Sequence, residues 1–276
     1  MKKEQTTLGI IAGGSVLPRT LIEFCRQQKR PVFVLALKGQ AEPDLLKGVK
    51  GEFIRLGAIG KAVRLLKKAN VKEIVFIGSV RRPSVAEICP DWKAWCMLCR
   101  VGFRLLGDDS LLKKILSEVE NLGFRVVGID TLMPELLATE GIYGKVKPSH
   151  ADMADIQQGF KVAKTLGQVD VGQAVIVQRG LVLAVEGIEG TAALIKRTAT
   201  LKRKGKGGVL VKVAKPQQDR RVDLPTIGPA TVQAVFDAGF KGIAVEKGAA
   251  LLAESKKMIK LADRLGIFVM GVSCKP

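Results

Sequence analysis

The chain has 276 residues, more than the roughly 100 to 150 of a typical domain, so its length predicts two domains. Hydrophobic residues make up 47%, which argues against a disordered chain, and the five cysteines are scattered, which argues against a disulfide-stapled fold. The chain has one histidine, which argues against a multi-histidine metal centre and a serine–histidine triad. The formal net charge of +19 favours an anionic partner, namely nucleic acid, a phosphorylated substrate or an anionic lipid surface, without choosing among them.

The first half of the chain alternates between short apolar runs and amphipathic segments. The run LGIIA ends in two glycines and a serine, after which Pro18 opens a helix-like stretch. Apolar strands that alternate with helices of about a dozen residues indicate a parallel sheet covered on both faces. The expected strands are residues 8–12, 31–37, 73–78 and 124–129, and the expected helices are residues 17–28, 59–70 and 108–123.

The alternation of apolar runs and amphipathic segments stops after Asp130. Residues 131–149 carry turn formers without periodicity, as expected of a connection between domains. Two strand-like runs then flank Arg179 and Gly180, which predicts a β-hairpin. Further strands are expected at residues 208–215, 242–246 and 267–272, and helices at residues 151–166, 190–201, 229–239 and 254–266.

This pattern predicts an α/β protein of two domains. Residues 1–130 are expected to form a Rossmann-like domain with an open parallel sheet, residues 131–149 a linker, and residues 150–276 an α/β domain with a mixed sheet. Neither end resembles a targeting segment, and no apolar run approaches the roughly 20 residues that span a bilayer. We therefore expect a cytoplasmic protein.

Two loops at predicted strand ends carry glycine and serine. IAGGSVLP, residues 11–18, places backbone N–H groups at a strand-to-helix turn, where they can hold a phosphate, and a tight turn without a ligand is the alternative. It lacks the third glycine of a dinucleotide fingerprint. FIGSVRRP, residues 76–83, adds two arginines, which can grip phosphate through paired hydrogen bonds. Together they favour a nucleotide or sugar-phosphate pocket over two solvated loops.

Most aspartates near helix starts need no catalytic explanation. Asp108 and Asp109 precede one predicted helix, and Asp152 and Asp155 begin another. Carboxylates at a helix N-terminus cap its N–H groups and complement its dipole. We interpret all four in this way.

Asp223, in the stretch RRVDLP, does not fit that explanation. It lies upstream of Gly228 and Pro229, which are suited to cap and begin the next helix themselves. Arg221 and Lys215 nearby would keep the carboxylate ionised at neutral pH, fit to bind a divalent metal or to orient water. A surface salt bridge is the alternative.

Six blocks of the sequence stand in a recognisable order. They are LGIIAGGSVLP (8–18), FIGSVRRP (76–83), GDDSLL (107–112), MADI (153–156), VGQAVIVQRGLVLAVEGIEGT (171–191) and VAKPQQDRRVDLPTIG (213–228). In these blocks the chain resembles the LpxI family of UDP-2,3-diacylglucosamine pyrophosphatases over nearly its full length. The resemblance implies two α/β domains with the substrate between them. It also implies Mg²⁺-dependent hydrolysis of UDP-2,3-diacylglucosamine to UMP and 2,3-diacylglucosamine 1-phosphate (lipid X) in lipid A biosynthesis.

The resemblance further implies site residues. Asp223 is the expected essential acid and metal ligand, with Lys215 and Arg221 offsetting the charge of the pyrophosphate and Glu186 or Glu189 as a second carboxylate for Mg²⁺. The expected substrate-binding residues are Gly13, Gly14, Ser15, Ser79, Val80, Arg82, Gln173 and Thr191. Three positions depart from the family pattern, with Ser15 for glycine, Ser79 for asparagine and Ala192 for aspartate. They put the fine substrate preference in doubt.

Partners follow from the substrate and the charge. A basic surface fits a substrate drawn from the anionic inner face of a membrane, so we expect peripheral association, and a homodimer stays open. A nucleic-acid-binding protein is one rival, disfavoured because aromatic residues are scarce and no nucleic-acid motif is recognised. Another is a redox enzyme acting on a nucleotide sugar, disfavoured by the incomplete glycine fingerprint.

Overall fold

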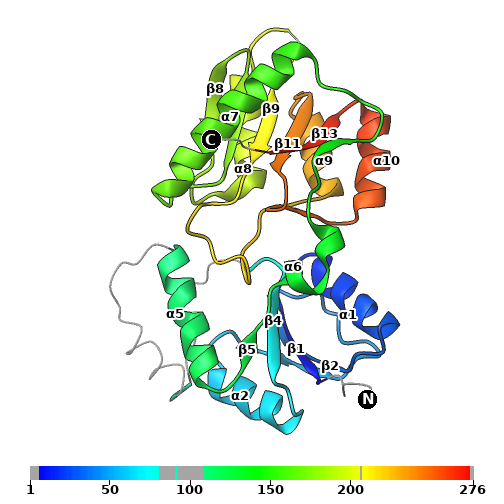
Figure 1. Ribbon diagram of the computed structural model, residues 1–276, viewed down its shortest axis with the longest axis vertical. Helices are drawn as coiled ribbons and strands as arrows, with labels where there is room; N and C mark the ends of the chain where they lie inside the picture. Colours follow the sequence, from blue (N-terminus) through cyan, green and yellow to red (C-terminus); the bar gives the residue numbers. More distant parts are fainter. Residues whose placement is uncertain (1–5, 81–90, 93–107, 206, 274–276) are drawn as a thin grey trace. The chain divides into compact units, whose positions relative to one another are not determined.

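The computed structural model describes residues 6–80, 91–92, 108–205 and 207–273, with only the backbone for residues 108–111 (Figure 1). The chain divides into two compact units, Met1–Met133 and Pro134–Pro276. Each is an α/β layer structure, and each is described by itself below.

The first unit is built on an open, fully parallel sheet of five strands in the order β3-β2-β1-β4-β5. This confirms the predicted Rossmann-like sheet, to which β3 adds an edge strand that we had not predicted. The strands are β1 (Leu8–Ala12), β2 (Val32–Leu37), β3 (Gly51–Ile54), β4 (Glu73–Ile77) and β5 (Arg125–Val126), and the helices are α1 (Leu17–Gln27), α2 (Ile59–Lys68), α5 (Asp108–Asn121) and α6 (Ile129–Leu132).

Burial on both faces explains the unbroken apolar runs of this sheet. Leu35 and Leu37 of β2 pack with Val63 and Leu66 of α2 in one cluster. The residues between them along β2 are also buried, and by strand alternation they face the other side. A strand buried on both faces shows no alternation of polar and apolar residues.

The strand order also fixes where the first unit can bind a ligand. Helix α1 leads from β1 to its neighbour β2, whereas α2 leads from β3 to β4 on the other side of β1. Right-handed crossovers in opposite directions put these helices on opposite faces of the sheet. The carboxyl ends of β1 and β4 therefore flank the topological switch point, the usual ligand crevice of such sheets.

The second unit has a mixed sheet of six strands, as predicted, in the order β6-β13-β11-β9-β7-β8. Strands β9, β11 and β13 are parallel, and β6, β7 and β8 each run antiparallel to a neighbour. The strands are β6 (Gly141–Tyr143), β7 (Ala174–Gln178), β8 (Leu181–Val185), β9 (Val209–Lys212), β11 (Gly242–Glu246) and β13 (Phe268–Val272), and β10 (Thr226–Ile227) pairs with β12 (Leu251–Leu252) in a separate ribbon.

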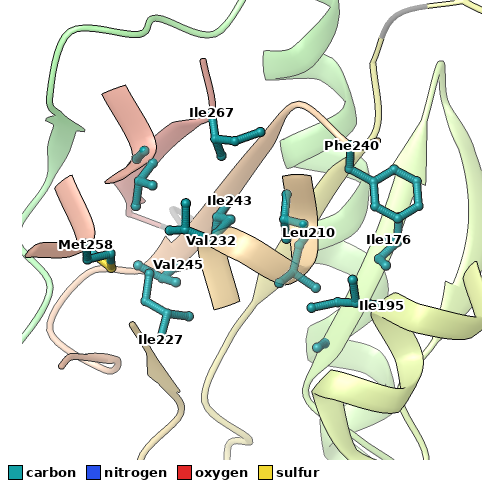
Figure 2. Close-up of a cluster of buried hydrophobic side chains, with 14 of the residues drawn as sticks. Ile176, Ile195, Leu210, Ile227, Val232, Phe240, Ile243, Val245, Met258 and Ile267 are labelled. Carbon is teal, nitrogen blue, oxygen red and sulfur yellow. The ribbon is translucent and has the colours of Figure 1, made fainter. Parts of the chain in front are cut away.

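Helices cover both faces of this second sheet. On one face α7 (His150–Gln168) packs through Ile156, Phe160 and Ala163. On the other face lie α8 (Gly190–Thr198), α9 (Pro229–Asp237) and α10 (Ser255–Leu265), in the cluster that Figure 2 shows around Leu210 and Ile243. Neighbouring residues on a strand alternate between the two clusters, which gives this unit two apolar layers.

The segment expected to link the domains is mostly part of the second unit. Its residues 134–149 belong to that unit, and Gly141–Tyr143 pairs antiparallel with β13 as the edge strand β6. Three residues of strand are too short to show a period in the sequence. Their structure is imposed by the neighbouring strand rather than by local pattern.

The turn at Arg179 and the caps of α9 and α7 hold with one correction, and the predicted caps Asp108 and Asp109 lie outside the residues whose side chains are described. Arg179 and Gly180 form the hairpin turn with positive φ, Gly228 caps α9 and Pro229 opens it. Asp152 completes a capping box with Ser149 at the start of α7. Asp155 does not cap the helix, because its buried carboxylate accepts hydrogen bonds from the N–H groups of Arg179 and Gly180 at 2.8 and 2.6 Å.

Candidate functional site

In the first unit the two glycine-containing loops meet at the switch point. Gly14 and Ser79 form a β-bridge, in which the Gly14 N–H donates to Ser79 O at 2.7 Å and the Ser79 N–H to Gly14 O at 2.9 Å. The Gly13 N–H donates to Ile77 O at 2.9 Å. The sequence-predicted residues Gly13, Gly14 and Ser79 are thus brought together.

The two glycines act differently from our expectation. Their N–H groups already donate to the carbonyls of Ile77 at the end of β4 and of Ser79 in the loop after it, so they do not point to a phosphate in this structure. Glycine is needed for the close approach of the loops, because a Cβ on Gly13 would lie 2.4 Å from Ser79 O and one on Gly78 would lie 2.3 Å from Gly14 O.

The remaining residues predicted in this unit lie at the rim of the loops. Ser15 is exposed with a φ of 87°, and its Oγ accepts a hydrogen bond from the Leu17 N–H at 3.4 Å. Glycine at this position, the family's usual residue, would adopt that φ without strain. Val80 is 45% exposed, and Arg82 lies outside the described residues.

In the second unit, polar residues gather at one edge of the sheet. Strand β9 ends at Lys212, opposite Ala174 at the start of antiparallel β7. Strand β8 ends just before Glu186, whose N–H donates to Ala174 O at 2.8 Å. The strand directions therefore place Lys212 and Glu186 at the same edge, from which the chain leaves β9 toward Asp223.

Glu186 is a buried carboxylate held by two residues that we had predicted to bind substrate. Its side chain is 5% exposed. Oε2 accepts from the Gln173 N–H at 3.1 Å, and Oε1 accepts from the Thr191 hydroxyl at 2.6 Å. Gln173 and Thr191 thus fix the position of Glu186.

Lys212 is a candidate functional residue that sequence reasoning missed. It is 8% exposed, its Nζ donates to Thr226 O at 3.2 Å, and it interacts electrostatically with both Glu186 and Asp223. Burial lowers the pKa of the Lys212 ammonium, and the two carboxylates act in the opposite direction. The one signal in the sequence is a lysine at the end of the apolar run GVLVK. We refer to Lys212, Glu186 and Asp223 as the charged cluster.

The two cations predicted beside Asp223 each pair with another acid in the described structure. Lys215 Nζ lies 2.5 Å from Asp170 Oδ1, and the Arg221 guanidinium donates to both oxygens of Asp219 at 2.8 and 3.0 Å. Each cation therefore already offsets the charge of an aspartate in this chain. Their role at the pyrophosphate stays a prediction, and Lys212 is a further cation whose charge acts on Asp223.

Comparison with known proteins decides the family. The LpxI N-terminal domain matches residues 7–136, and the LpxI C-terminal domain matches residues 139–270. UDP-2,3-diacylglucosamine pyrophosphatase LpxI of Caulobacter vibrioides is 39% identical to this chain over 272 residues, which cover 96% of this chain and 97% of that protein. The chain belongs to the LpxI family.

The cluster of this LpxI-family chain fits a magnesium ion that uses few protein ligands. Among the described residues no group of three or more His, Cys, Asp or Glu side chains could hold a metal by itself. Mg²⁺ commonly takes one or two carboxylates and fills its other positions with water and substrate phosphate oxygens. Asp223 is half-buried and Glu186 is fixed beside the same lysine, so these two are the candidate ligands.

Two amides close to the cluster in sequence have unused hydrogen-bonding capacity. Gln173 Oε1 and Gln218 Nε2 are buried without a hydrogen-bond partner among the described residues. Such atoms are costly unless a ligand or water satisfies them, which is typical of a binding site. Glu189 is not part of this arrangement, because it pairs with Arg197 and lines a surface hollow with Ala193 and Lys196.

Proposed function

We propose that this protein hydrolyses the pyrophosphate bond of UDP-2,3-diacylglucosamine with Mg²⁺, giving UMP and 2,3-diacylglucosamine 1-phosphate (lipid X) in lipid A biosynthesis. Membership of the LpxI family and the printed activity of the Caulobacter vibrioides relative support the substrate. The charged cluster at the edge of the second sheet is the observation that carries the chemistry.

Asp223 is the residue that we assign to the reaction itself. With Glu186 it would hold Mg²⁺, which when bound supplies positive charge to the pyrophosphate oxygens. The half-buried Asp223 carboxylate is suited to bind a cation and to orient a water molecule, and the charge of Lys212 acts on it. Lys215 and Arg221 also shape the chain between β9 and Asp223 through their ion pairs with Asp170 and Asp219.

Attack of water at either phosphorus would give the same two products, and we propose attack on the glucosamine side. The oxygen of a water molecule attacks the phosphorus on the glucosamine side, and the bond from that phosphorus to the bridging oxygen breaks. UMP leaves with the bridging oxygen, and the phosphate stays on the sugar. The unpartnered Gln173 Oε1 and Gln218 Nε2 are suited to accept from and donate to polar substrate atoms.

The first unit supplies a candidate nucleotide-binding crevice. The loops that contain Gly14 and Ser79 lie at the switch point of its parallel sheet, where nucleotides bind in many folds of this type. We assign to this crevice the exposed residues of the two loops, namely Ser15, Ser79 and Val80. Arg82 is assigned to it from the sequence alone, since it lies outside the described residues.

The test is incubation with UDP-2,3-diacylglucosamine and either Mg²⁺ or EDTA, with UMP and the lipid product resolved. We expect metal-dependent UMP release by the wild type. Asp223→Ala should lower kcat by about 100-fold or more, as for loss of a group that stabilises transition-state charge, while substrate still binds.

Asp237→Ala is the matched control, because Asp237 is an exposed acid at the end of α9 that accepts a hydrogen bond from Gln233. It should retain wild-type kcat. Full activity of Asp223→Ala would remove Asp223 from the mechanism. No UMP release by the wild type with Mg²⁺ would contradict the proposed reaction.

We also propose that the protein works at the inner face of a membrane, where a diacylated substrate resides. The net charge of +19 supports attraction to anionic lipid. No helix in the described part of the chain has the length and apolar composition needed to cross a bilayer.

A further inference from the structure

We propose that Lys212 is a positioning residue for the reaction, whose buried ammonium holds the Asp223 carboxylate where it acts while Glu186 serves as a second counter-ion. This inference rests on the proposed function and assigns a role to a residue that the sequence motifs do not mark. It follows from the placement of Lys212 in the sheet, its contacts with the chain around Asp223 and the charges of the cluster.

The backbone of Lys212 is fixed more firmly than that of any loop residue of the site. Strand β9 lies between β7 and β11, and Lys212 is aligned with Ala174 on one side and Val245 on the other. Two neighbouring strands therefore set the point from which its side chain extends. A charge mounted on a central strand is more precisely placed than one on a loop.

The Lys212 side chain interacts with the segment of chain that carries Asp223 through one hydrogen bond and through its charge. Its Nζ donates to the carbonyl of Thr226 at 3.2 Å, and its charge attracts the Asp223 carboxylate. Thr226 begins strand β10, which pairs with β12, so the hydrogen bond ties Lys212 to an ordered part of the chain just beyond Asp223. Both interactions restrain Asp223 relative to the sheet.

The other partly buried lysines of this unit are paired differently. Lys164, Lys215 and Lys241 form close ion pairs of 2.5 to 3.1 Å with Glu246, Asp170 and Asp152 respectively. Lys212 forms no such close ion pair with a described residue, and its ammonium donates to a carbonyl while its charge acts on two carboxylates. A one-to-one ion pair fixes two side chains to each other, whereas this arrangement leaves Asp223 able to take a further cation.

A purely structural role explains this arrangement less well. Replacing a buried charge and its partner with apolar residues is often neutral or stabilising, so stability alone is a weak reason to bury Lys212 and Glu186. Gln173 and Thr191 moreover hold the Glu186 side chain in place through hydrogen bonds. The cluster is therefore built to keep one ammonium and two carboxylates together.

The experiment is a double-mutant cycle on Lys212→Met and Asp223→Asn, with kcat and KM for UDP-2,3-diacylglucosamine measured at saturating Mg²⁺. We expect Lys212→Met to lower kcat by about 100-fold, with KM changed by less than about threefold, because it removes an interaction used by the reacting groups. The double variant should be no more than about threefold slower than Asp223→Asn, since Lys212 acts through Asp223.

Thermal unfolding of the same four chains gives a readout that needs no activity. We expect Asp223→Asn to lower the unfolding midpoint in the wild-type background by more than in the Lys212→Met background, because the carboxylate has an ammonium partner only in the former. The unfolding midpoints test the coupling of Lys212 and Asp223, whereas the wild-type kcat tests the proposed reaction, so the two can fail separately. An inactive wild type with coupled midpoints contradicts the reaction alone.

Lys241→Met is the matched control, since it removes a lysine that is paired with a buried acid elsewhere in the same unit. It should leave kcat unchanged. If Lys212→Met does not fold, Lys212→Gln replaces it, because glutamine keeps a donor for Thr226 O without the charge. The proposal would be overturned if the rate effects of Lys212→Met and Asp223→Asn multiplied in the double variant. A wild-type kcat in Lys212→Met or Lys212→Gln would also overturn it, as would an equal midpoint shift for Asp223→Asn with and without Lys212.

Discussion

At the scale of single residues, Asp223 shows how far local sequence is from local chemistry. Two arginines precede it in RRVDLP, yet Arg221 turns to Asp219 and Arg220 donates to the Gly248 carbonyl. Lys212, at the end of a strand, is a distant residue in the sequence whose charge interacts with Asp223. Side chains that are neighbours in an irregular segment point in different directions. The local sequence therefore marked Asp223 as an unusual acid but did not reveal its interaction with Lys212.

Gly13 gives a prediction at the same scale. A Cβ at this position would meet the Ser79 carbonyl oxygen at 2.4 Å, a backbone atom that cannot turn aside. Gly13→Ala should therefore lower the free energy of unfolding of the first unit by about 1 to 3 kcal/mol, as overpacking does elsewhere, which urea titration would measure.

Gly14→Ala is the graded comparison for that experiment. Its nearest contact would be 3.1 Å, which small shifts can relieve, so its cost should be the smaller of the two. Wild-type stability of Gly13→Ala would show that the two loops do not approach as closely as described.

At the scale of elements, helix α7 shows two acids one turn apart with different roles. Asp152 accepts from the Ser149 N–H and hydroxyl at 2.8 and 2.6 Å and from Lys241 Nζ at 3.1 Å. Asp155 points to the turn between β7 and β8. The capping acid follows from local sequence, whereas the second acid depends on which hairpin packs against the helix.

The capping interaction of Asp152 predicts a pH dependence. Burial acts to raise the pKa of Asp152, but the hydrogen bonds from Ser149 and Lys241 outweigh it and lower the pKa below the ordinary value. A carboxyl with a depressed pKa stabilises the fold above its unfolded-state pKa and loses that contribution as pH falls through the folded-state value. Wild type should thus exceed Asp152→Asn in stability by about 1 kcal/mol at pH 7.

That difference should shrink progressively below about pH 4, which urea unfolding at several pH values would measure. Lys241→Met should lose less, since it keeps the capping box. A difference between wild type and Asp152→Asn that stays constant from neutral pH down to about pH 3 would exclude this explanation.

At the scale of the whole molecule, the net charge of +19 has consequences that no single ion pair carries. Many of the cations are paired locally, as for Arg19 with Glu42 and Lys247 with Glu140, but the excess of basic residues leaves a positive field. A surface of this kind is attracted to anionic lipid over roughly a Debye length, about 10 Å at 0.1 M salt.

The protein should therefore sediment with vesicles that contain anionic lipid at low salt and be released at about 1 M salt, where the Debye length is about 3 Å. Vesicles of zwitterionic lipid alone are the control and should retain little protein. Failure to bind anionic vesicles at low salt would count against peripheral association.

The sequence by itself determined the α/β plan of both domains, a sheet with helices on both faces. Long apolar runs and amphipathic helices predicted the parallel sheet, the mixed sheet, the hairpin at Arg179 and the start of α9 at Pro229, because local pattern and turn chemistry specify such elements. The resemblance of six blocks to the LpxI family, and the place of Asp223 in one of them, were also readable.

Only the tertiary structure decided which residues meet. The antiparallel direction of β7 brings Glu186 beside the end of β9, the pairing with β13 makes a strand of Gly141–Tyr143, and the bridge from Gly14 to Ser79 occupies the N–H groups that we had assigned to phosphate. Strand order and direction are non-local properties, since they depend on segments far apart in the chain. A buried charge such as Lys212 becomes visible as a functional residue only when its distant partners are in place.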